Sequence, residues 1–280
     1  MTSDSHFRGW AKPGPVPPGA VARTTAADGE SLDAISGHYR LFQLRDGHRF
    51  STDDILTAWY GTTWCPSART ALDLGSGIGT VGMIVAWRLP GVRMVTIEAQ
   101  SVSVALARKS ARYNGVEERY ELREGDFREP GLLREDEAFD LVTGSPPYFP
   151  TGTGVESGHP QKLACRFELR GDIGDYCAVA SRHLAPGGWF ACVFPHEPVQ
   201  RERVEAGASA AGLVIVRRRP VVFREGDPAL VGLFGMMRRV DLPDWMQGRT
   251  WVEPDLIIRD RSGAIHPEYS AVKLAIGFPP

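Results

Sequence analysis

Residues 71–80 have the sequence Ala-Leu-Asp-Leu-Gly-Ser-Gly-Ile-Gly-Thr, in which a short apolar run leads into three alternate glycines. The following residues, 81–89, have the apolar pattern of a helix. Glycines at such a strand-to-helix turn permit tight backbone geometry and let a ligand approach the main chain, while the helix N-terminus favours negative charge. The stretch therefore predicts the first strand, turn and helix of a ligand-binding α/β sheet.

The same glycines admit two interpretations. Residues 77–82 fit G-x-G-x-x-G, the dinucleotide fingerprint, and Glu98 lies about where a ribose-binding acid would follow. Asp73 favours the other interpretation, because a carboxylate just before the glycines would repel a pyrophosphate and suit a ligand that carries an ammonium group. No candidate acid for hydride transfer and no second substrate domain accompany the fingerprint, so a dehydrogenase is the weakest interpretation.

Polar side chains are expected at the ends of four successive strands. Two further strands are predicted at 92–98 and 120–127, separated by a helix at 101–114 that ends at an Asn-Gly C-cap. The four side chains are Asp73, Glu98, Asp126 and Ser145. Singly, each acid is typical of a solvated loop, but together they mark the carboxyl edge where open α/β sheets bind ligands. Glu98 is expected to accept hydrogen bonds from ribose hydroxyls and Asp126 from an adenine amino group, with Phe127 covering a ring face.

The segment Ser145-Pro146-Pro147-Tyr148 follows the apolar run 139–144. Two prolines fix φ twice and leave carbonyl groups with no competing local donor. Ser145 adds a hydroxyl acceptor and Tyr148 a flat face for stacking. The segment could hold a planar base or amide by its NH2 group. A plain strand-to-loop turn is the alternative, and the glycine motif upstream favours the binding interpretation.

Together these motifs resemble those of the class I S-adenosylmethionine-dependent methyltransferases, with residues 73–79 as the glycine-rich motif and 145–148 as the amino-methylating motif. More narrowly, the chain is similar to the bacterial tRNA(Val) adenine-N6 methyltransferases. They share segments similar to 43–54 and 253–260, followed by Gly263 and Glu268-Tyr269, so that the likeness covers about residues 38–275. The family usually has Asn where this chain has Ser145, and Ser also occurs there in amino-methyltransferases.

The expected fold is an α/β, Rossmann-like, seven-stranded, mostly parallel sheet with an antiparallel C-terminal hairpin, helices on both faces and a short N-terminal hairpin-helix extension. Alternating strand and helix patterns support the parallel sheet. The extension is predicted as a hairpin at 37–50, turning at Asp46-Gly47, and a helix from Ser51 to Trp64. Residues 1–30, rich in Pro, Gly and Ala, are expected to form a flexible leader to a single domain, 31–280. Residues 149–158 are expected to form a mobile loop beside the site.

The resemblance implies S-adenosylmethionine as cofactor and adenine N6 in tRNA as the methyl acceptor. Cofactor-binding residues would be Phe50, Thr52, Asp73, Gly75, Gly77, Gly79, Glu98, Asp126 and Phe127. Catalytic residues would be Ser145, Pro146, Pro147 and Tyr148. Substrate-binding residues would be Lys162, Arg166, Arg217, Arg218 and Arg219. A base amine of rRNA or DNA, a protein glutamine amide, and a catalytically silent partner subunit are the alternatives.

Composition restricts these possibilities only loosely. The formal net charge of −2 gives nucleic-acid binding no support, although residues 199–240 carry eight arginines against four acids. Arginines 217–219 could equally guard a sheet edge. No apolar run approaches the ~18 residues of a membrane span, and no signal-peptide pattern begins the chain. Four scattered cysteines without C-x-x-C indicate neither a zinc site nor disulfides. A cytoplasmic monomer without metal is therefore expected.

Overall fold

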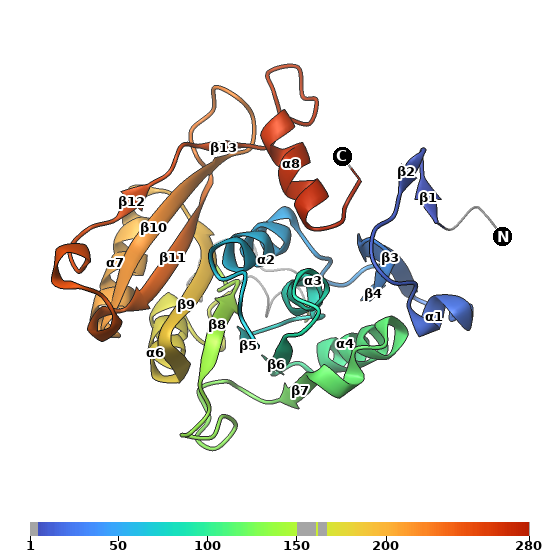
Figure 1. The fold of residues 1–280 in the computed structure, drawn as a ribbon, viewed down its shortest axis with the longest axis horizontal. Coiled ribbons are helices and arrows are strands. Elements are labelled where there is room, and N and C mark those ends of the chain that lie inside the picture. The colour runs from blue at the N-terminus through green and yellow to red at the C-terminus, as the bar shows by residue number, and fades with distance from the viewer. Residues whose placement is uncertain (1–4, 150–160, 162–166, 280) are drawn as a thin grey trace.

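The computed structural model describes residues 5–149, 161 and 167–279, and its centre is one twisted sheet (Figure 1). Five parallel strands occupy one half of this sheet, in the order β7 (Tyr120–Glu124), β6 (Arg93–Glu98), β5 (Thr70–Leu74), β8 (Phe139–Gly144) and β9 (Leu184–Pro195). β11 (Val231–Arg238) runs antiparallel between β9 and β10 (Leu213–Val222). The order confirms the expected seven-stranded core and its antiparallel hairpin.

Two short strands extend the sheet beyond that core. β12 (Trp251–Val252) and β13 (Leu256–Ile257) each pair in parallel with β10, so nine strands form the sheet within the described residues. The expectation of seven strands omitted both, because two residues are too few to show a period-2 pattern.

Helices cover both faces of the sheet, as expected. α2 (Thr52–Trp64), α3 (Thr80–Arg88) and α4 (Ser101–Asn114) share one hydrophobic cluster, whereas α6 (Ile173–His183) and α7 (Pro198–Ala210) share another (Figure 1). Side chains alternate across β5: Ala71 belongs to the first cluster, and Leu72 and Leu74 belong to the second. Asp73 therefore points to the side of the sheet that α2 and α3 cover.

The N-terminal extension is present, but its hairpin is not where the sequence predicts it. β3 (Glu30–Ser36) pairs with β4 (Tyr39–Leu44) around Gly37, whose φ is 50°. The expected turn at Asp46-Gly47 lies instead in the connection from β4 to α2. There the Gln161 side chain approaches Gly47 where a Cβ would stand, and its Oε1 accepts the His48 N–H at 2.8 Å. The predicted hairpin at 37–50 is therefore wrong: the observed hairpin spans residues 30–44 and turns at Gly37.

Side chains of α4 bind the hairpin, among them Ser110, whose Oγ accepts the Phe42 N–H at 3.0 Å. Asn114 accepts the Arg40 N–H through Oδ1 at 2.9 Å and donates to the Arg40 carbonyl through Nδ2 at 2.8 Å. Before the hairpin, the chain forms β1 (His6–Phe7), β2 (Trp10–Ala11) and the one-turn helix α1 (Pro18–Val21). A Cβ on Gly19 of α1 would meet the Tyr113 side chain of α4, so this turn lies against the domain.

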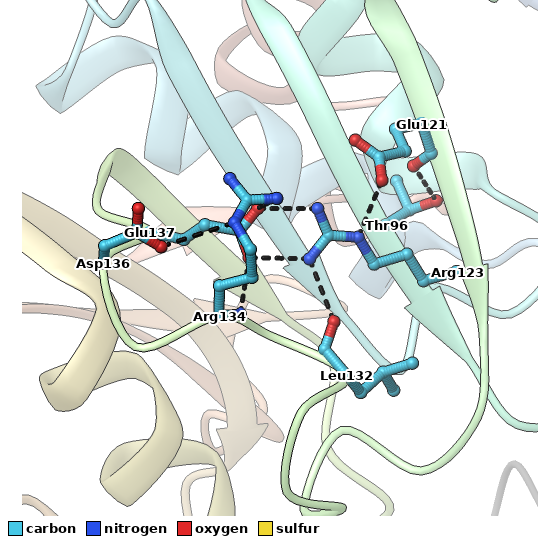
Figure 2. Close-up of polar contacts among 7 residues, drawn as sticks. All are labelled: Thr96, Glu121, Arg123, Leu132, Arg134, Asp136 and Glu137. Atoms are coloured by element: carbon cyan, nitrogen blue, oxygen red, sulfur yellow. Dashed lines mark hydrogen bonds and ion pairs between the residues drawn. The ribbon is translucent and has the colours of Figure 1, made fainter.

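An ion pair stabilises the connection between β7 and β8 (Figure 2). Arg123 of β7 donates to both carboxylate oxygens of Glu137, at 2.6 and 2.7 Å, and the two side chains are only 12% and 10% exposed. The Arg123 guanidinium lowers the pKa of Glu137 to about 2. This connection delivers the chain into β8, which ends immediately before Ser145.

The remaining elements are short. They are the 3-10 turns η1 (Glu117–Arg119), η2 (Arg239–Asp241) and η3 (Asp244–Met246), and the helix α8 (Pro267–Ala275). Among the described residues, no helix is both long and apolar enough to cross a membrane.

Candidate active site

A cavity of about 620 Å³ opens at the carboxyl edge of the sheet. Its walls come from the residues that follow β5, β6, β7 and β8, together with the first turn of α2. This is the edge at which the sequence places its four polar strand ends, and the structure brings all four to one cavity. The cavity residues include Asp73, Gly75, Gly77, Glu98, Asp126, Phe127, Ser145, Pro146, Pro147 and Tyr148.

The glycine-rich turn after β5 adopts a backbone that other residues rarely adopt. Gly75, Gly77 and Gly79 have φ values of 61°, 54° and 87°, all in the left-handed region. A Cβ on Gly77 would meet no atom within 4 Å, which shows that this part of the turn faces open space. Gly79 does not line the cavity; it is the N-cap of α3 and packs beside Tyr120.

Glu98 is held by the backbone around it. Its Oε2 accepts the Gly77 N–H at 2.9 Å and its Oε1 accepts the Gln100 N–H at 2.7 Å. Burial raises the pKa of this carboxyl group. Each carboxylate oxygen retains a further lone pair, so Glu98 can still accept hydrogen bonds from a ligand.

Asp73 has an unsatisfied oxygen. Its side chain is buried, and Oδ1 accepts from the Thr143 hydroxyl at 2.7 Å, whereas Oδ2 has no hydrogen-bond partner. Burial raises the pKa of Asp73 to about 7, with nearby Asp54 and Glu98 acting in the same direction. A buried carboxylate oxygen without a partner is costly, and a cation in the cavity would relieve that cost.

Asp126 and Phe127 form the wall after β7. Asp126 is bound by Arg128, at 2.6 and 2.9 Å, and the guanidinium lowers the pKa of the carboxyl group. The Phe127 ring meets Tyr176 of α6 edge to face, with centroids 4.6 Å apart. Both residues therefore have fixed orientations at the cavity wall.

Like Gly79, two further expected cofactor residues lie beside the cavity without lining it. Phe50 packs against Phe278, with ring centroids 6.4 Å apart, and Thr52 begins α2. Their neighbours Ser51, Asp53 and Asp54 line the cavity instead.

The segment 145–148 forms one wall of the cavity and is bound to α2. The Tyr148 hydroxyl donates to Asp53 Oδ2 at 2.6 Å, and its ring meets Phe194 edge to face at 5.7 Å. The Ser145 hydroxyl lies 3.4 Å from Thr57 Oγ1 of the same helix. Both ends of the segment are thus held by the first turns of one helix.

Asp53 and Asp54 were not predicted to belong to the site. Residues 51–54 were predicted as a helix start, and the structure confirms a capping box in which Asp54 accepts the Ser51 N–H at 2.9 Å. The presence of two adjacent acids could have indicated a role in the site, because only one of them can occupy the capping position. Three exposed arginines at the cavity were also missed: Arg45, Arg49 and Arg170.

The arginines of β10 do not line this cavity. Arg217 stacks on Trp64 with its guanidinium 3.5 Å from the ring centroid, Arg219 lies 5.7 Å from that of Trp59, and Arg218 pairs with Glu205 at 3.5 Å. Alternate side chains of a strand point to opposite faces, which divides the three between the two sides of the sheet. Lys162, Arg166 and residues 150–158 of the expected mobile loop lie outside the described residues.

Comparison with known proteins identifies the class of enzyme. Residues 62–198 match the model of the methyltransferase small domain family. A tRNA1(Val) (adenine(37)-N6)-methyltransferase of Porphyromonas gingivalis is 26% identical over 233 residues, which cover 79% of this chain and 85% of that protein. The chain is an S-adenosylmethionine-dependent methyltransferase.

Two further relatives define how far the likeness extends. The release factor glutamine methyltransferase of Caulobacter vibrioides is 34% identical over 158 residues, and the match spans about half of each protein, 54% of this chain and 53% of the relative. The structure of a predicted O-methyltransferase from Agrobacterium tumefaciens superposes with a TM-score of 0.59 at 20% identity, covering 81% of this methyltransferase and 98% of that chain. The last comparison confirms the fold.

The cofactor of this methyltransferase is S-adenosylmethionine, and the cavity has the donors and acceptors that such a ligand needs. Asp73 offers an unpartnered carboxylate oxygen for an ammonium group, and Gly77 leaves open space beside the backbone. In the part of the chain that the structure describes, no group of three His, Cys, Asp or Glu residues could hold a metal ion.

Proposed function

We propose that this enzyme methylates an exocyclic amine, and that its acceptor is adenine N6 in tRNA. The observation that carries the proposal is the position of residues 145–148 in the wall of the cavity that also contains the glycine-rich turn and Asp73. An amine held by that wall would face the same space as the cofactor.

Each wall of the cavity has a proposed role. Asp73 would pair with the ammonium of the methionine moiety through its free Oδ2, and Glu98 would accept from the ribose hydroxyls. Asp126 and Phe127 would lie at the adenine. Phe50, Thr52 and Gly79 would support these groups from behind, since they adjoin the cavity without lining it.

The acceptor would be bound by the other wall. S-adenosylmethionine supplies an electrophilic methyl group when it is bound. The Ser145 hydroxyl and the Pro146 carbonyl would accept the two amino hydrogens, and these bonds strengthen as positive charge develops on nitrogen. Tyr148, anchored through Asp53, would stack on the base and hold it in line. The proton can leave to water after transfer, so this arrangement needs no dedicated base.

Both kinds of charge line the cavity, and the arginines among them would suit a polyanionic acceptor. Five acids line it, namely Asp53, Asp54, Asp73, Glu98 and Asp126, and they suit a cationic cofactor. The exposed Arg45, Arg49 and Arg170 line the same cavity. Arginine side chains at this position would pair with phosphates of a nucleic acid that brings its base to Tyr148. Arg217, Arg218 and Arg219 would contact more distant phosphates, if they bind substrate.

A protein glutamine amide is the second candidate. It is favoured by the 34% identity with a release factor glutamine methyltransferase over 158 residues, a stretch that includes about half of this chain. The same NH2-binding wall would serve an amide, because an amide is also planar and also donates two hydrogens.

A competition between acceptors tests the proposal. The enzyme is incubated with methyl-labelled S-adenosylmethionine, unmodified tRNA(Val) transcript and a release factor, each alone and together. We expect label in the RNA at least tenfold above label in the protein. Label confined to the release factor would replace the RNA proposal with the amide one, and Asp73→Asn enzyme provides the background for both.

A further inference from the structure

A second cavity, of about 250 Å³, lies between α2, β10 and α8. It is lined by Trp59, Arg219, Leu256, Glu268, Ala271 and Val272. Figure 1 shows α8 beside α2 and β13. The C-terminal segments that resemble the tRNA(Val) adenine-N6 methyltransferases supply Leu256 and Glu268, and neither residue lines the active-site cavity. This part of the resemblance therefore points to a site apart from that of methyl transfer.

The Arg219 side chain makes no hydrogen bond or ion pair within the part of the chain that the structure describes. Its Nε is buried, and its guanidinium carbon lies 5.7 Å from the ring centroid of Trp59. Arg217 points to the same side of β10 but has a partner, since it stacks on Trp64 and lies 3.8 Å from Glu253 Oε1. A buried donor without an acceptor is costly, and a ligand that brings an acceptor to Arg219 would remove that cost.

Glu268 lines the same cavity from α8. Its Oε2 accepts the Ile257 N–H at 3.2 Å, which holds the carboxylate beside β13. The side chain is 41% exposed, and its remaining lone pairs are available to a ligand. Among the described residues, Arg219 and Glu268 form no ion pair with each other although both line the cavity. The cavity therefore presents donors on one wall and acceptors on another.

The chemistry of these walls favours a nucleobase over a phosphate. Trp59 offers a ring face for stacking, and Leu256 and Val272 offer apolar contact to a flat ring. A phosphate would be attracted by Arg219 but repelled by Glu268. Guanine suits both, because its O6 and N7 accept from an arginine and its N1–H and N2 amino group donate to a carboxylate. Adenine has a donor at N6 beside N7, and so cannot accept two hydrogen bonds from a guanidinium at that edge.

We propose that this cavity binds an unpaired guanine of the RNA substrate, stacked on Trp59 and held between Arg219 and Glu268. The inference rests on the proposed RNA acceptor and deepens it, since it names a second nucleotide that the enzyme would read. Asp54 and Trp59 belong to one helix, which places the two cavities about 8 Å apart along its axis. One loop of RNA would reach both.

The test compares two short RNA probes that contain no adenine, an oligouridylate and the same oligouridylate with one central guanosine. Binding of each probe to the full chain is measured by fluorescence anisotropy. We expect the guanosine to lower Kd roughly tenfold, the effect of one bidentate contact to a base. Arg219→Lys keeps the charge and loses the planar fork, whereas Glu268→Gln keeps an oxygen for the Ile257 N–H and loses the charge. Each variant should reduce the difference between the probes to less than about twofold.

Arg217→Lys is the matched control. Arg217 has the same direction on β10 and also lies over a tryptophan, but it lines neither cavity. A phosphate contact carries no sequence information, so any loss from this change would affect both probes equally and leave the roughly tenfold difference in place. Thermal denaturation of the three variants checks that each is folded.

Equal Kd values for the two probes with the wild-type enzyme would overturn the inference. A difference that survives Arg219→Lys while both probes bind more weakly would also overturn it, because Arg219 would then bind a phosphate. Binding of a release factor without binding of either probe would overturn it in favour of a peptide ligand. Failure of the proposed function is distinguishable, because an enzyme that methylates tRNA without preferring guanosine would keep that function and lose only this site.

Discussion

Asp73 is a residue whose charge state depends on what the cavity holds. Its carboxyl group is buried with one oxygen unpaired, and its pKa is raised to about 7 against about 3.9 in an unfolded chain. Between these values the folded protein holds a proton that the unfolded chain has released. Ionisation of Asp73 therefore costs the folded protein nothing below pH 4. The free energy of unfolding falls as the pH rises from about 4 to about 7, and above pH 7 it stays lower by up to about 4 kcal/mol.

Replacing this acid should separate stability from binding. We expect Asp73→Asn to raise the melting temperature of the cofactor-free enzyme at pH 8 and to have little effect at pH 4. The same change should weaken S-adenosylmethionine binding at pH 8 at least tenfold, because it removes the partner of the ammonium group. Thermal denaturation and calorimetry measure the two effects. Unchanged affinity in the variant would show that Asp73 does not bind the cofactor.

At this scale the sequence was informative about residues at strand ends. Asp73, Glu98, Asp126 and Ser145 could be assigned to one cavity because parallel strands bring their carboxyl ends together. The role of Asp53 could not be predicted in the same way. Its bond to Tyr148 joins residues 95 positions apart in the chain, and depends on how α2 packs beside β8.

At the scale of an element, the ion pair of Glu137 with Arg123 stabilises the connection that leads into β8. We expect Glu137→Gln to destabilise the protein by about 2–3 kcal/mol at pH 7, since it leaves Arg123 without its mostly buried partner. The folded pKa of about 2 lies below the usual value, so the contribution is present above about pH 4.3 and is lost as pH falls toward 2. Chemical denaturation at pH 7 and pH 3 measures the difference.

Glu121→Gln provides the matched control. Glu121 also pairs with Arg123, at 2.9 Å, but its side chain is 60% exposed, and exposed pairs contribute about 0–1 kcal/mol. Equal losses in the two variants would contradict the assignment of stability to the Glu137 pair.

Elements with strong periodicity were predictable, and short ones were not. The helix expected at 101–114 matches α4 at both ends, since the Asn-Gly C-cap marks its stop. The hairpin was misplaced because two turn signals compete in residues 37–47. Gly37 forms the turn, whereas Gly47 is needed for close packing against Gln161. Distinguishing the two needs tertiary contacts that a local pattern does not contain.

On the scale of the whole molecule, net charge says little about the substrate. The chain carries a net charge of −2, yet five acids and the arginines Arg45, Arg49 and Arg170 line one cavity. We propose that residues 31–280 act as one domain, supported by the bonds from Asn114 of α4 to the β3–β4 hairpin. Such an arrangement would bring the cationic cofactor and a polyanionic substrate to the same opening.

The measurement that tests the central claim most directly is nucleoside analysis of methylated tRNA. Total tRNA from a strain that lacks this enzyme is incubated with the enzyme and labelled S-adenosylmethionine, digested, and analysed by mass spectrometry. The proposed function predicts label in N6-methyladenosine, and at least tenfold less label from Asp73→Asn enzyme at a limiting concentration of S-adenosylmethionine. Label in another nucleoside, or no label in RNA from an enzyme that binds the cofactor, would contradict it.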